Sequence, residues 1–429
     1  MYRKFSIYYF LLALLSVIPF YGYAQNEINS PYSSFGVGIL NSRANGVMNS
    51  MGGTGYALRN PYFLNFKNPA SYSEFDSLTF IADGSLSLYR NTLQSSSIIQ
   101  NNSRARFDYV AIALPITHYW GSSLGVIPFS DFGYNISDSA LIPNLGTADY
   151  RYAGEGGLMQ LYWGNGFKIT KQLHLGITLS YLWGNFNTLR FMEFQDPTVY
   201  NSKIAQIKNV DGLRYNIGLQ YDFKLKENQK LTLGLVYENS AYIGTRDHIL
   251  ITNYFGAYEN TTSFDTVLIK TGDDAVKGTL KIPQYIGLGF SYAFKDKYLV
   301  SGDFTFQNWT RFSGTGISDT LKDNYISSIG LQYIPDSKST KYFKKINYRA
   351  GFRYSSGYMV VKNTPISDFV FSVGAGFPLR TFNTKSSINI LLEYGKMGTL
   401  TNGLIDENIL RVSLNFILHE RWYQRVKLD

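Results

Sequence analysis

The stretch from Leu410 to Leu418 reads LRVSLNFIL, and its apolar residues fall at every second position, with Ile417 as the single exception. A period of two places all the even-numbered residues on one face of a β-strand. That apolar face could meet either lipid or a protein core. The same pattern recurs along nearly the whole chain, behind an N-terminal secretion signal and with no later apolar segment of helix length. This combination indicates a transmembrane β-barrel of the outer-membrane type.

Residues 1–24 have the order of charged, apolar and small residues that is typical of a secretory signal peptide. The apolar run from Phe5 to Phe20 has 16 residues, fewer than the roughly 20 that a membrane-spanning helix needs. We therefore predict cleavage before Gln25 rather than a membrane helix. The chain has no cysteine, so neither disulfides nor attachment through a lipidated cysteine is expected.

The composition of the remaining chain, about 405 residues, favours one large barrel over two or three soluble domains. Tyr (35) and Phe (30) are abundant, Gly reaches 39, and charged residues make up only 17%. These values are typical of strands with one lipid face, aromatic girdles and a crowded lumen. Loss of Arg3 and Lys4 with the signal lowers the net charge from +9 to +7. The remaining cations are dispersed among turns and inner positions instead of forming one face, so nucleic-acid binding is not expected.

About 14 strands follow residue 76, which predicts an all-β fold, a 14-stranded antiparallel transmembrane β-barrel. Short connections alternate with longer ones, notably at 137–153, 188–210 and 242–282. This alternation matches short periplasmic turns and long extracellular loops, which a soluble β-sandwich or propeller would not need. The predicted strands are 77–89, 105–117, 119–136, 154–169, 172–187, 211–223, 229–241, 283–294, 298–309, 324–334, 346–356, 366–379, 386–395 and 408–418.

Strand alternation also predicts which residues face the lumen. Between residues 173 and 183, the odd-numbered apolar residues should face lipid and the even-numbered residues should face inward. A charged side chain costs less free energy on the inner face than at the bilayer midplane. We therefore predict a polar lumen of mixed charge, lined by Arg214, Glu238, Asp303, Arg349, Arg353, Glu393 and Arg411.

Residues 25–76 show no strand pattern and are rich in Gly and Asn. They contain FGVG at 35–38, MGGTGYA at 51–57 and the motif Asn68-Pro69-Ala70. These stretches resemble the N-terminal hatch of the FadL-type long-chain fatty acid transporter family of outer-membrane barrels, in which an Asn-Pro-Ala motif precedes the first of 14 strands. The resemblance is close over about 45 residues and is architectural elsewhere. Leu58-Arg59-Asn60 stands where that family often has an acidic pair, which puts ligand contacts there in doubt.

The resemblance implies three parts of the chain: a signal peptide at 1–24, an N-terminal hatch or plug at 25–76, and a transmembrane barrel at 77–429. In this reading the hatch folds back into the lumen. The alternative is a disordered periplasmic tail that leaves the lumen open.

Pro128 lies inside the third predicted strand, in the stretch GVIPFS that begins at Gly125. Proline cannot donate a hydrogen bond to the ladder, so within a closed wall it must occupy a bulge or a break. The resemblance implies an inward kink of this strand, with a lateral opening in the wall near Gly125 and Pro128. A bulge without functional consequence is the alternative.

The sequence gives little support for an enzyme, a cofactor or a metal site. The four histidines stand near strand ends or in loops, with no nucleophile motif around them. No cysteine occurs and no two histidines have metal-ligand spacing, so we expect neither a metal nor a cofactor.

Two functions remain open for a barrel in the outer membrane of a Gram-negative bacterium, where membrane lipid is its first partner. The first, implied by the resemblance, is uptake of hydrophobic small molecules, captured by the extracellular loops and released laterally or through the hatch. The alternative is a non-transporting accessory or scaffold subunit of an outer-membrane protein assembly (BAM-like) or secretion complex. A hydrophobic ligand needs a mostly apolar pocket, whereas the predicted inner positions are Gly, Ser, Thr and charged residues, which fits the scaffold better. The aromatic-rich loop Thr252–Tyr258 could serve either a ligand or a protein partner.

Overall fold

A computed structural model describes residues 29–256, 264–317, 319–379 and 385–421. The predicted signal peptide at 1–24 and the predicted cleavage site before Gln25 lie outside the described residues. Within them, no helix has the length and hydropathy needed to cross a bilayer.

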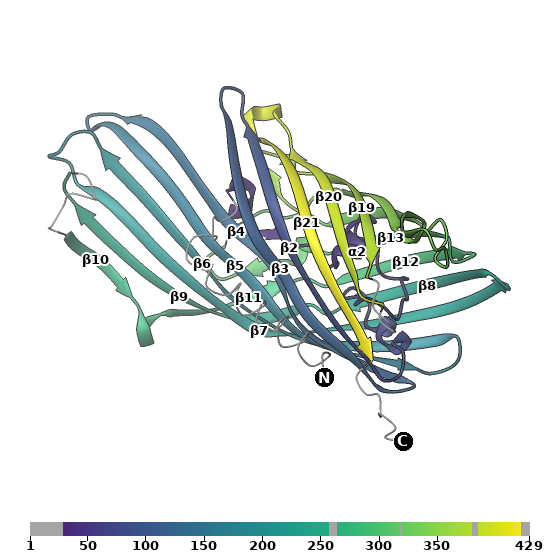
Figure 1. The fold of residues 1–429 in the computed structure, drawn as a ribbon. Helices are drawn as coiled ribbons and strands as arrows, with labels where there is room; N and C mark the ends of the chain where they lie inside the picture. Colours follow the sequence, from purple (N-terminus) through teal and green to yellow (C-terminus); the bar gives the residue numbers. More distant parts are fainter. Residues whose placement is uncertain (1–28, 257–263, 318, 380–384, 422–429) are drawn as a thin grey trace, which may run out of the picture.

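The chain forms a closed antiparallel barrel of 14 strands, which confirms the predicted fold (Figure 1). Two of the 14 wall strands are interrupted, so each consists of two consecutive segments, β8 with β9 and β11 with β12. The wall strands are β2 (Thr79–Gln94), β3 (Ile99–Thr117), β4 (Trp120–Ile142), β5 (Gly146–Lys168), β6 (Leu173–Phe194), β7 (Asn201–Lys226), β8 (Gln229–Glu238) with β9 (Ala241–Tyr254), β11 (Val276–Ile282) with β12 (Tyr285–Phe294), β13 (Tyr298–Gln307), β15 (Asn324–Tyr333), β16 (Asn347–Ser355), β19 (Asp368–Pro378), β20 (Ser387–Gly398) and β21 (Asp406–Arg421).

The first and last wall strands close the barrel. β2 pairs with β21 along its whole length, from Thr79 opposite Arg421 to Gln94 opposite Asp406. Both chain ends of the barrel therefore lie at one end of the molecule, which also carries the tight connections such as Thr170 to Gln172. We call this end the short-turn end and the opposite one the long-loop end.

The strands at the long-loop end are longer than predicted, and three predicted loops are wrong. The hairpin of β4 and β5 continues through 137–153 until Ile142 pairs with Gly146. Most of 188–210 belongs to β6 and β7, and 242–282 contains β9, β10 (Phe264–Lys270) and β11. These extensions carry no apolar alternation because both faces of a strand meet water outside the membrane, while the hydrogen-bond ladder continues.

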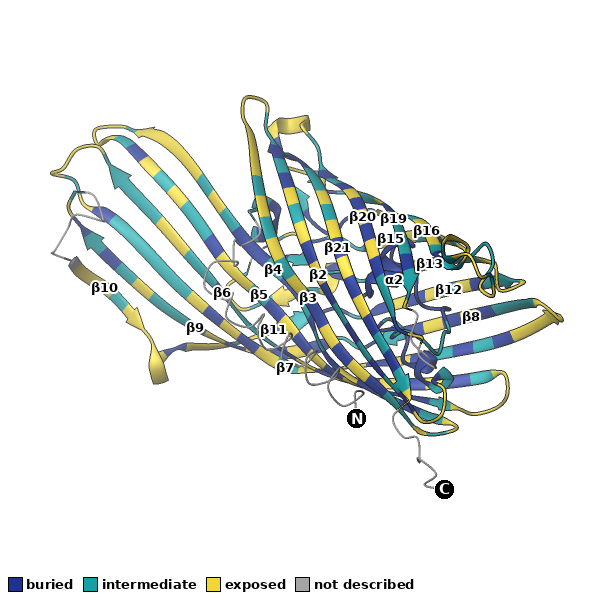
Figure 2. Cartoon of the chain, in the orientation of Figure 1, coloured by how far each residue is buried: buried dark blue, intermediate teal, exposed yellow. Residues whose placement is uncertain are grey.

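The outer face of the wall is apolar, and the inner face carries most of the buried polar residues of the wall together with buried apolar residues such as Leu182 and Ile243. Figure 2 shows the alternating bands of exposed and buried residues along the strands. Leu414 is 37% exposed, whereas Ser413 beside it is 1% exposed. Ile417, the exception in the opening pattern, points inward and packs in a buried apolar cluster with residues of the N-terminal segment, including Leu64 and Phe66.

The N-terminal segment up to residue 76 lies inside the barrel, in contact with the inner face of the wall (Figure 1, purple). It contains only short elements: η2 (Pro31–Ser34), β1 (Ile39–Leu40), α2 (Gly46–Asn49) and η3 (Pro69–Glu74). Most of its residues between Ala44 and Tyr72 are buried. The remaining short elements of the chain lie in the connections between wall strands: β14 (Ser313–Gly314), β17 (Val360–Val361), β18 (Thr364–Pro365), η5 (Gly272–Asp274), η6 (Trp309–Arg311), η7 (Tyr342–Lys345) and η8 (Thr401–Gly403).

Candidate functional site

The Asn68-Pro69-Ala70 motif begins the 3-10 helix η3 and lies against a row of glycines in the wall. The Asn68 side chain accepts a hydrogen bond from the Ala70 N–H (3.1 Å) and donates one to the Tyr56 carbonyl (2.7 Å). Gly166, Gly176 and Gly218 are register partners on β5, β6 and β7. A Cβ at Gly176 would lie 2.3 Å from the Ala70 nitrogen, so only glycine permits this approach of two backbones.

The segment from Met51 to Tyr56 lies equally close to other strands of the wall. A Cβ at Gly351 on β16 would lie 2.0 Å from the Gly52 nitrogen, and one at Gly234 on β8, the strand next to β7, would lie 2.0 Å from the Tyr56 carbonyl oxygen. The inner wall is therefore shaped to the backbone of the N-terminal segment along several strands.

Asp303, on β13, holds the same segment by charge. Its carboxylate accepts hydrogen bonds from the N–H groups of Gly55 (2.8 Å) and Tyr56 (3.2 Å), and it pairs with Lys67 Nζ (2.9 Å). Lys67 Nζ also lies 4.1 Å from the centre of the Tyr56 ring, a cation–π contact. Burial raises the pKa of Tyr56, so its hydroxyl stays protonated and hydrogen-bonds to Thr305 (2.9 Å).

Glu238, at the end of β8, binds two arginines. Arg214 on β7 pairs with it at 2.7 Å, and Arg43 of the N-terminal segment contacts both of its carboxylate oxygens. Burial lowers the pKa of Arg43, but the Glu238 carboxylate together with Tyr285 and Tyr56 outweighs burial, and the net pKa is raised. Arg43 therefore stays charged, and one buried carboxylate joins the N-terminal segment to the wall through charge-assisted hydrogen bonds.

A second charged cluster lies where β20, β21, β3 and β4 meet. Arg411 on β21 pairs with Asp108 (3.0 Å) and with Glu393 (2.9 Å). Arg106 on β3 pairs with Asp108 (3.3 Å) and with Asp131 on β4. The cluster joins four wall strands through side chains that point into the lumen.

The last two predicted inner charges lie on β16. Arg353 pairs with Asp368 (3.2 Å). Arg349 is buried and donates hydrogen bonds to Gln332 (2.8 Å) and Asn389 (2.9 Å), with no carboxylate partner among the described residues. The structure thus places all seven predicted charges on the inner face, and six of them have a counter-ion.

The wall between β3 and β4 is paired only over its lower part. The ladder runs from Thr117 opposite Trp120 to Val110 opposite Val126 and stops there, although both strands continue beyond it. Pro128 lies just past this point, at a register shift between β4 and β5. Gly125 lies inside the paired part, where a Cβ would meet Ala111 at 2.5 Å. The unpaired stretch, which we call the β3–β4 seam, therefore begins above Gly125.

Part of this seam is occupied by the N-terminal segment. β1 pairs antiparallel with β4, Leu40 opposite Ser130 and Ile39 opposite Asp131. Asp131 also forms ion pairs with Arg106 and, at 3.6 Å, with Arg104, both on β3. The two edges of the seam are therefore joined by charge instead of by a hydrogen-bond ladder.

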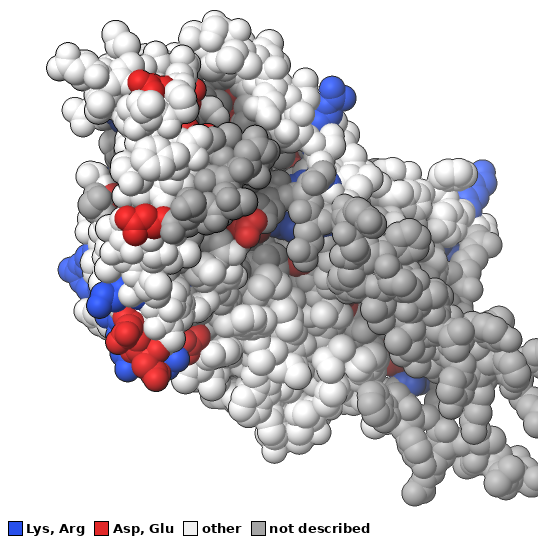
Figure 3. Space-filling model, turned by 90° about the vertical axis from the view of Figure 1, so that its left-hand side faces the viewer, with Lys and Arg blue, Asp and Glu red and all other residues white. Residues whose placement is uncertain are grey.

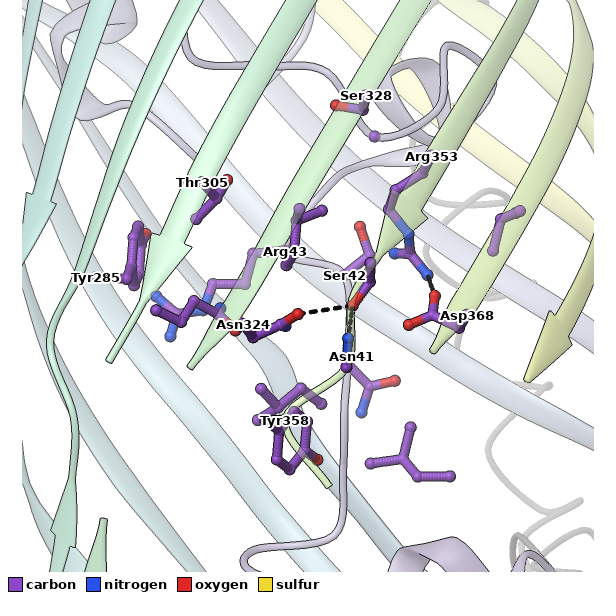
Figure 4. A pocket seen from close by; sticks show the side chains of 18 of the residues that line it. Asn41, Ser42, Arg43, Tyr285, Thr305, Asn324, Ser328, Arg353, Tyr358 and Asp368 are labelled. Carbon is purple, nitrogen blue, oxygen red and sulfur yellow. Dashed lines mark hydrogen bonds and ion pairs between the residues drawn. The ribbon is translucent and has the colours of Figure 1, made fainter. Parts of the chain in front are cut away.

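A cavity of about 230 Å³ lies between the N-terminal segment and the wall. Figure 4 shows Arg43, Tyr285 and Thr305 on one side of it and Arg353 with Asp368 on the other. Cations and hydrogen-bonding groups contribute to its lining together with apolar residues such as Ile366 and Met397. The cavity volume is below the roughly 300–1,000 Å³ of typical small-molecule pockets.

His174 on β6 lies between Ser73 and Asp222. The Ser73 hydroxyl is 3.0 Å from His174 Nδ1, and His174 Nε2 is 3.6 Å from Asp222. The order of residues resembles a catalytic triad, but Ser73 donates its proton to the Ala70 carbonyl (2.8 Å) and Asp222 pairs with Lys230 (2.9 Å). These contacts make the trio a structural link between η3 and the wall. Among the described residues, no group of three His, Asp or Glu side chains has the arrangement of a metal site.

Comparison with known families resolves the relationship of this chain. The model of the BamG family matches residues 1–429, which is the whole sequence. The chain belongs to the BamG family. A search of curated proteins finds no match to it.

The solved structures that resemble this BamG-family chain are FadL-type barrels, which confirms the resemblance expected from the sequence. The Pseudomonas putida toluene transporter TodX has a TM-score of 0.61 at 13% identity, covering 90% of this chain and 100% of that chain. The Ralstonia pickettii toluene transporter TbuX has a TM-score of 0.60 at 14% identity, with 89% and 100% covered. A FadL homologue of Pseudomonas aeruginosa has a TM-score of 0.55 at 13% identity, with 90% and 100% covered. At these identities the likeness shows the fold alone.

Several residues that build the interior of this BamG-family barrel were not singled out from the sequence. Asp108, Asp131 and Asp368 are the counter-ions of predicted inner charges or of neighbouring arginines. Strand alternation would also mark Asp131 and Asp368 as inward, whereas Asp108 points inward only because of a bulge opposite Ser85 and Leu86. Of the proposed aromatic loop, Thr252 to Tyr254 is strand instead. Tyr254 is buried and its hydroxyl donates to Glu193 (2.8 Å), while 257–258 lies outside the described residues.

Proposed function

We propose that this BamG-family barrel is a non-transporting accessory subunit of an outer-membrane complex of the barrel-assembly type. The observation that carries the proposal is the fit between the N-terminal segment and the wall. Wall glycines accept its backbone, and Asp303 and Glu238 hold it by buried charge. Releasing it would take Lys67 from Asp303 and Arg43 from Glu238, which would keep only Arg214, and loss of such partners is costly in a buried setting.

The match of the whole chain to the BamG family model supports this reading. A subunit that positions other proteins needs a rigid barrel with a filled interior. The N-terminal segment, acting as a permanent plug, supplies that filling. In this reading the short-turn end faces the periplasm and the long-loop end faces the outside of the cell.

Uptake of hydrophobic molecules is the second candidate, and the β3–β4 seam is the observation that favours it. A break in the ladder above Val126 gives a lateral route from the lumen to the membrane. The proteins TodX and TbuX, which share the fold, are toluene transporters. In this reading Pro128 ends the ladder, and the ion pairs of Asp131 must part to open the seam.

One experiment separates the two functions. The chain, tagged and expressed at its natural level, is purified in mild detergent, and its size on native gels is measured together with mass spectrometry of co-purifying proteins. We expect a stable complex that contains other outer-membrane proteins. We also expect that cells depleted of the chain contain smaller amounts of other folded outer-membrane barrels, measured by their heat-modifiable gel mobility.

The matching transport measurement uses radiolabelled toluene in cells that carry either the parent chain or Asp131→Ala. Removal of Asp131 loosens the seam without touching lipid-facing residues. Equal uptake in both strains and in cells without the chain supports the accessory role. If the barrel is monomeric and toluene uptake is saturable and depends on Asp131, the accessory role is wrong and the transport role takes its place.

A further inference from the structure

The short-turn end carries a row of lysines that form no ion pair among the described residues. Three turns of neighbouring wall strands meet there: β7–β8, β12–β13 and β15–β16, in the order in which the strands pair. Backbone hydrogen bonds join the turns, from Lys295 N–H to Asn228 (2.9 Å) and from Ile334 N–H to Lys297 (2.8 Å). We call six of the exposed lysines of these turns the basic ridge: Lys224, Lys226, Lys295, Lys297, Lys341 and Lys344.

The ridge has a strong excess of positive charge. The same turns contain three acids, Glu227, Asp296 and Asp336, and Asp336 is already bound by the backbone N–H of Lys338 (3.0 Å). Among the described residues, none of the six ridge lysines forms an ion pair. The sequence disperses these lysines over 120 positions, and the expectation that cations form no common face is therefore wrong for this end of the barrel.

The opposite end has no such excess. Exposed acids such as Asp138 and Asp274 stand there beside exposed bases such as Arg151 and Lys270. Figure 3, which views the left-hand side of Figure 1, shows acidic and basic side chains together on that face. The positive charge is thus a property of one end, not of the whole surface.

The direction of the lysines distinguishes an aqueous partner from lipid headgroups. On the β7–β8 hairpin the outward positions are Phe223 and Leu225, 39% and 52% exposed, in line with the lipid-facing residues above them. Lys224 alternates with them and shares the inner side of the strand with buried Asp222, and Lys226 follows a register shift at the turn. Lys224 therefore projects below the lumen, toward water. Phe343, 76% exposed between the ridge lysines of η7, adds an apolar contact in the same place.

We propose that the basic ridge is the docking site of an acidic segment of a periplasmic protein. Complementary charge steers such a partner and fixes its register, while the exposed aromatic ring contributes apolar area. Binding to the anionic lipid headgroups around the barrel would require lysines on the lipid-facing side of the strands, where Phe223 and Leu225 lie instead of Lys224. The inference rests on the proposed function as to compartment and complex, and it adds the site and the chemistry of the partner.

The test uses the full chain in cells, with a photo-crosslinking amino acid at Asn228, in the β7–β8 turn of the ridge and next to Lys295. We expect an adduct with a periplasmic protein, and mass spectrometry should map the link to a segment rich in Asp and Glu. The triple variant Lys226→Glu, Lys297→Glu, Lys344→Glu should lower the adduct yield about tenfold, as expected when three exposed ion pairs worth a few tenths of a kcal/mol or more each turn repulsive.

The matched control reverses three exposed cations at the other end, Arg151→Glu, Lys270→Glu and Lys277→Glu, with the same change in net charge. It should leave the adduct unchanged. Adducts formed mainly with phospholipid, a linked segment without acidic character, or equal yield from the ridge variant would each overturn the proposal.

The outcome can be told apart from failure of the proposed function. If the ridge variant still co-purifies with other outer-membrane proteins but the acidic adduct never forms, the ridge proposal alone is wrong. If the acidic adduct forms and depends on the ridge while the barrel purifies from no outer-membrane complex, the accessory role in barrel assembly is wrong and the ridge proposal stands.

Discussion

Substitution of Gly176 by valine should force the N-terminal plug away from the wall while leaving the barrel closed. Valine suits a β-strand, and its backbone partners in the ladder remain in place. Its Cβ, however, would lie 2.3 Å from the Ala70 nitrogen and from the Pro69 carbonyl carbon. Neither of those backbone atoms can turn aside as a side chain can, so η3 must move.

The size of the effect follows from the contacts that η3 and its neighbours would lose. Forcing extra methyl groups into a packed interior costs about 1–3 kcal/mol. Movement of η3 also removes the hydrogen bond from Asn68 to Leu219 (3.2 Å), the one between Ser73 and His174 (3.0 Å) and the one from Arg59 to Gln220 (3.0 Å). Each hydrogen bond contributes about 0.5–1.5 kcal/mol, so the docking free energy of the plug falls by about 3 kcal/mol or more in total. This corresponds to about a hundredfold shift of the equilibrium toward the undocked plug.

Limited trypsin digestion of the folded protein in detergent measures this shift. In the parent, the Arg59 side chain is 1% exposed and the Lys67 side chain 16% exposed, so both sites should resist cleavage. In Gly176→Val they should be cut while the barrel keeps its heat-modifiable mobility. Gly244→Val is the control, because its nearest neighbour would lie at 3.7 Å. A folded Gly176→Val protein as resistant as the parent would refute the claim that the wall glycines hold the plug.

Three further predictions concern the wall and the lumen. Leu414→Arg should reduce the amount of barrel that inserts into the membrane, since arginine near the bilayer midplane costs about 2–4 kcal/mol. Leu141→Arg, at a residue that is 77% exposed on the long-loop extension, should have little effect. Urea unfolding in lipid vesicles compares the stability of the two variants, and equal stability would contradict the assignment of Leu414 to the lipid-facing surface. Deletion of 31–72 should leave a foldable barrel with measurable conductance in planar bilayers, and a deletion that stays closed would mean that wall side chains fill the lumen. Glu238→Gln leaves the guanidinium groups of Arg43 and Arg214 without their counter-ion, so we expect the free energy of unfolding to fall by about 3–5 kcal/mol. The measurement is the midpoint of unfolding, which should be lower; an unchanged midpoint would show that the two ion pairs contribute no stability.

The lipid-facing part of the wall could be predicted because one physical cause acts on every residue there. Lipid on one side and a polar interior on the other impose a period of two, as at Leu414 and Ser413. Even the exception was informative, since Ile417 points inward where the N-terminal segment offers apolar partners. Beyond the membrane this cause vanishes, and so the sequence predicts loops where extensions such as 137–153 continue the strands.

The partners of the inner residues could not be predicted, because the barrel brings them together from distant parts of the chain. Asp108 and Arg411 pair across 303 positions, and Gly351 meets Gly52 only because the wall curves round the plug. Alternation marks a residue as inward but gives no information about which strand lies opposite. The basic ridge escaped notice for the same reason, since its lysines become neighbours only when their turns are aligned.

The position of the plug in the chain has a consequence for the order of biogenesis. η3 is joined to β2 by only four residues, and β2 forms the closing ladder with β21, the last strand to be made. The plug is enclosed by the strands between them, which press on it from several sides. Those strands must therefore gather round the plug first, and the pairing of Thr79 with Arg421 completes the enclosure. This long-range closure is a slow kind of step, so a factor that holds β2 and β21 apart would determine when the finished barrel is released into the membrane.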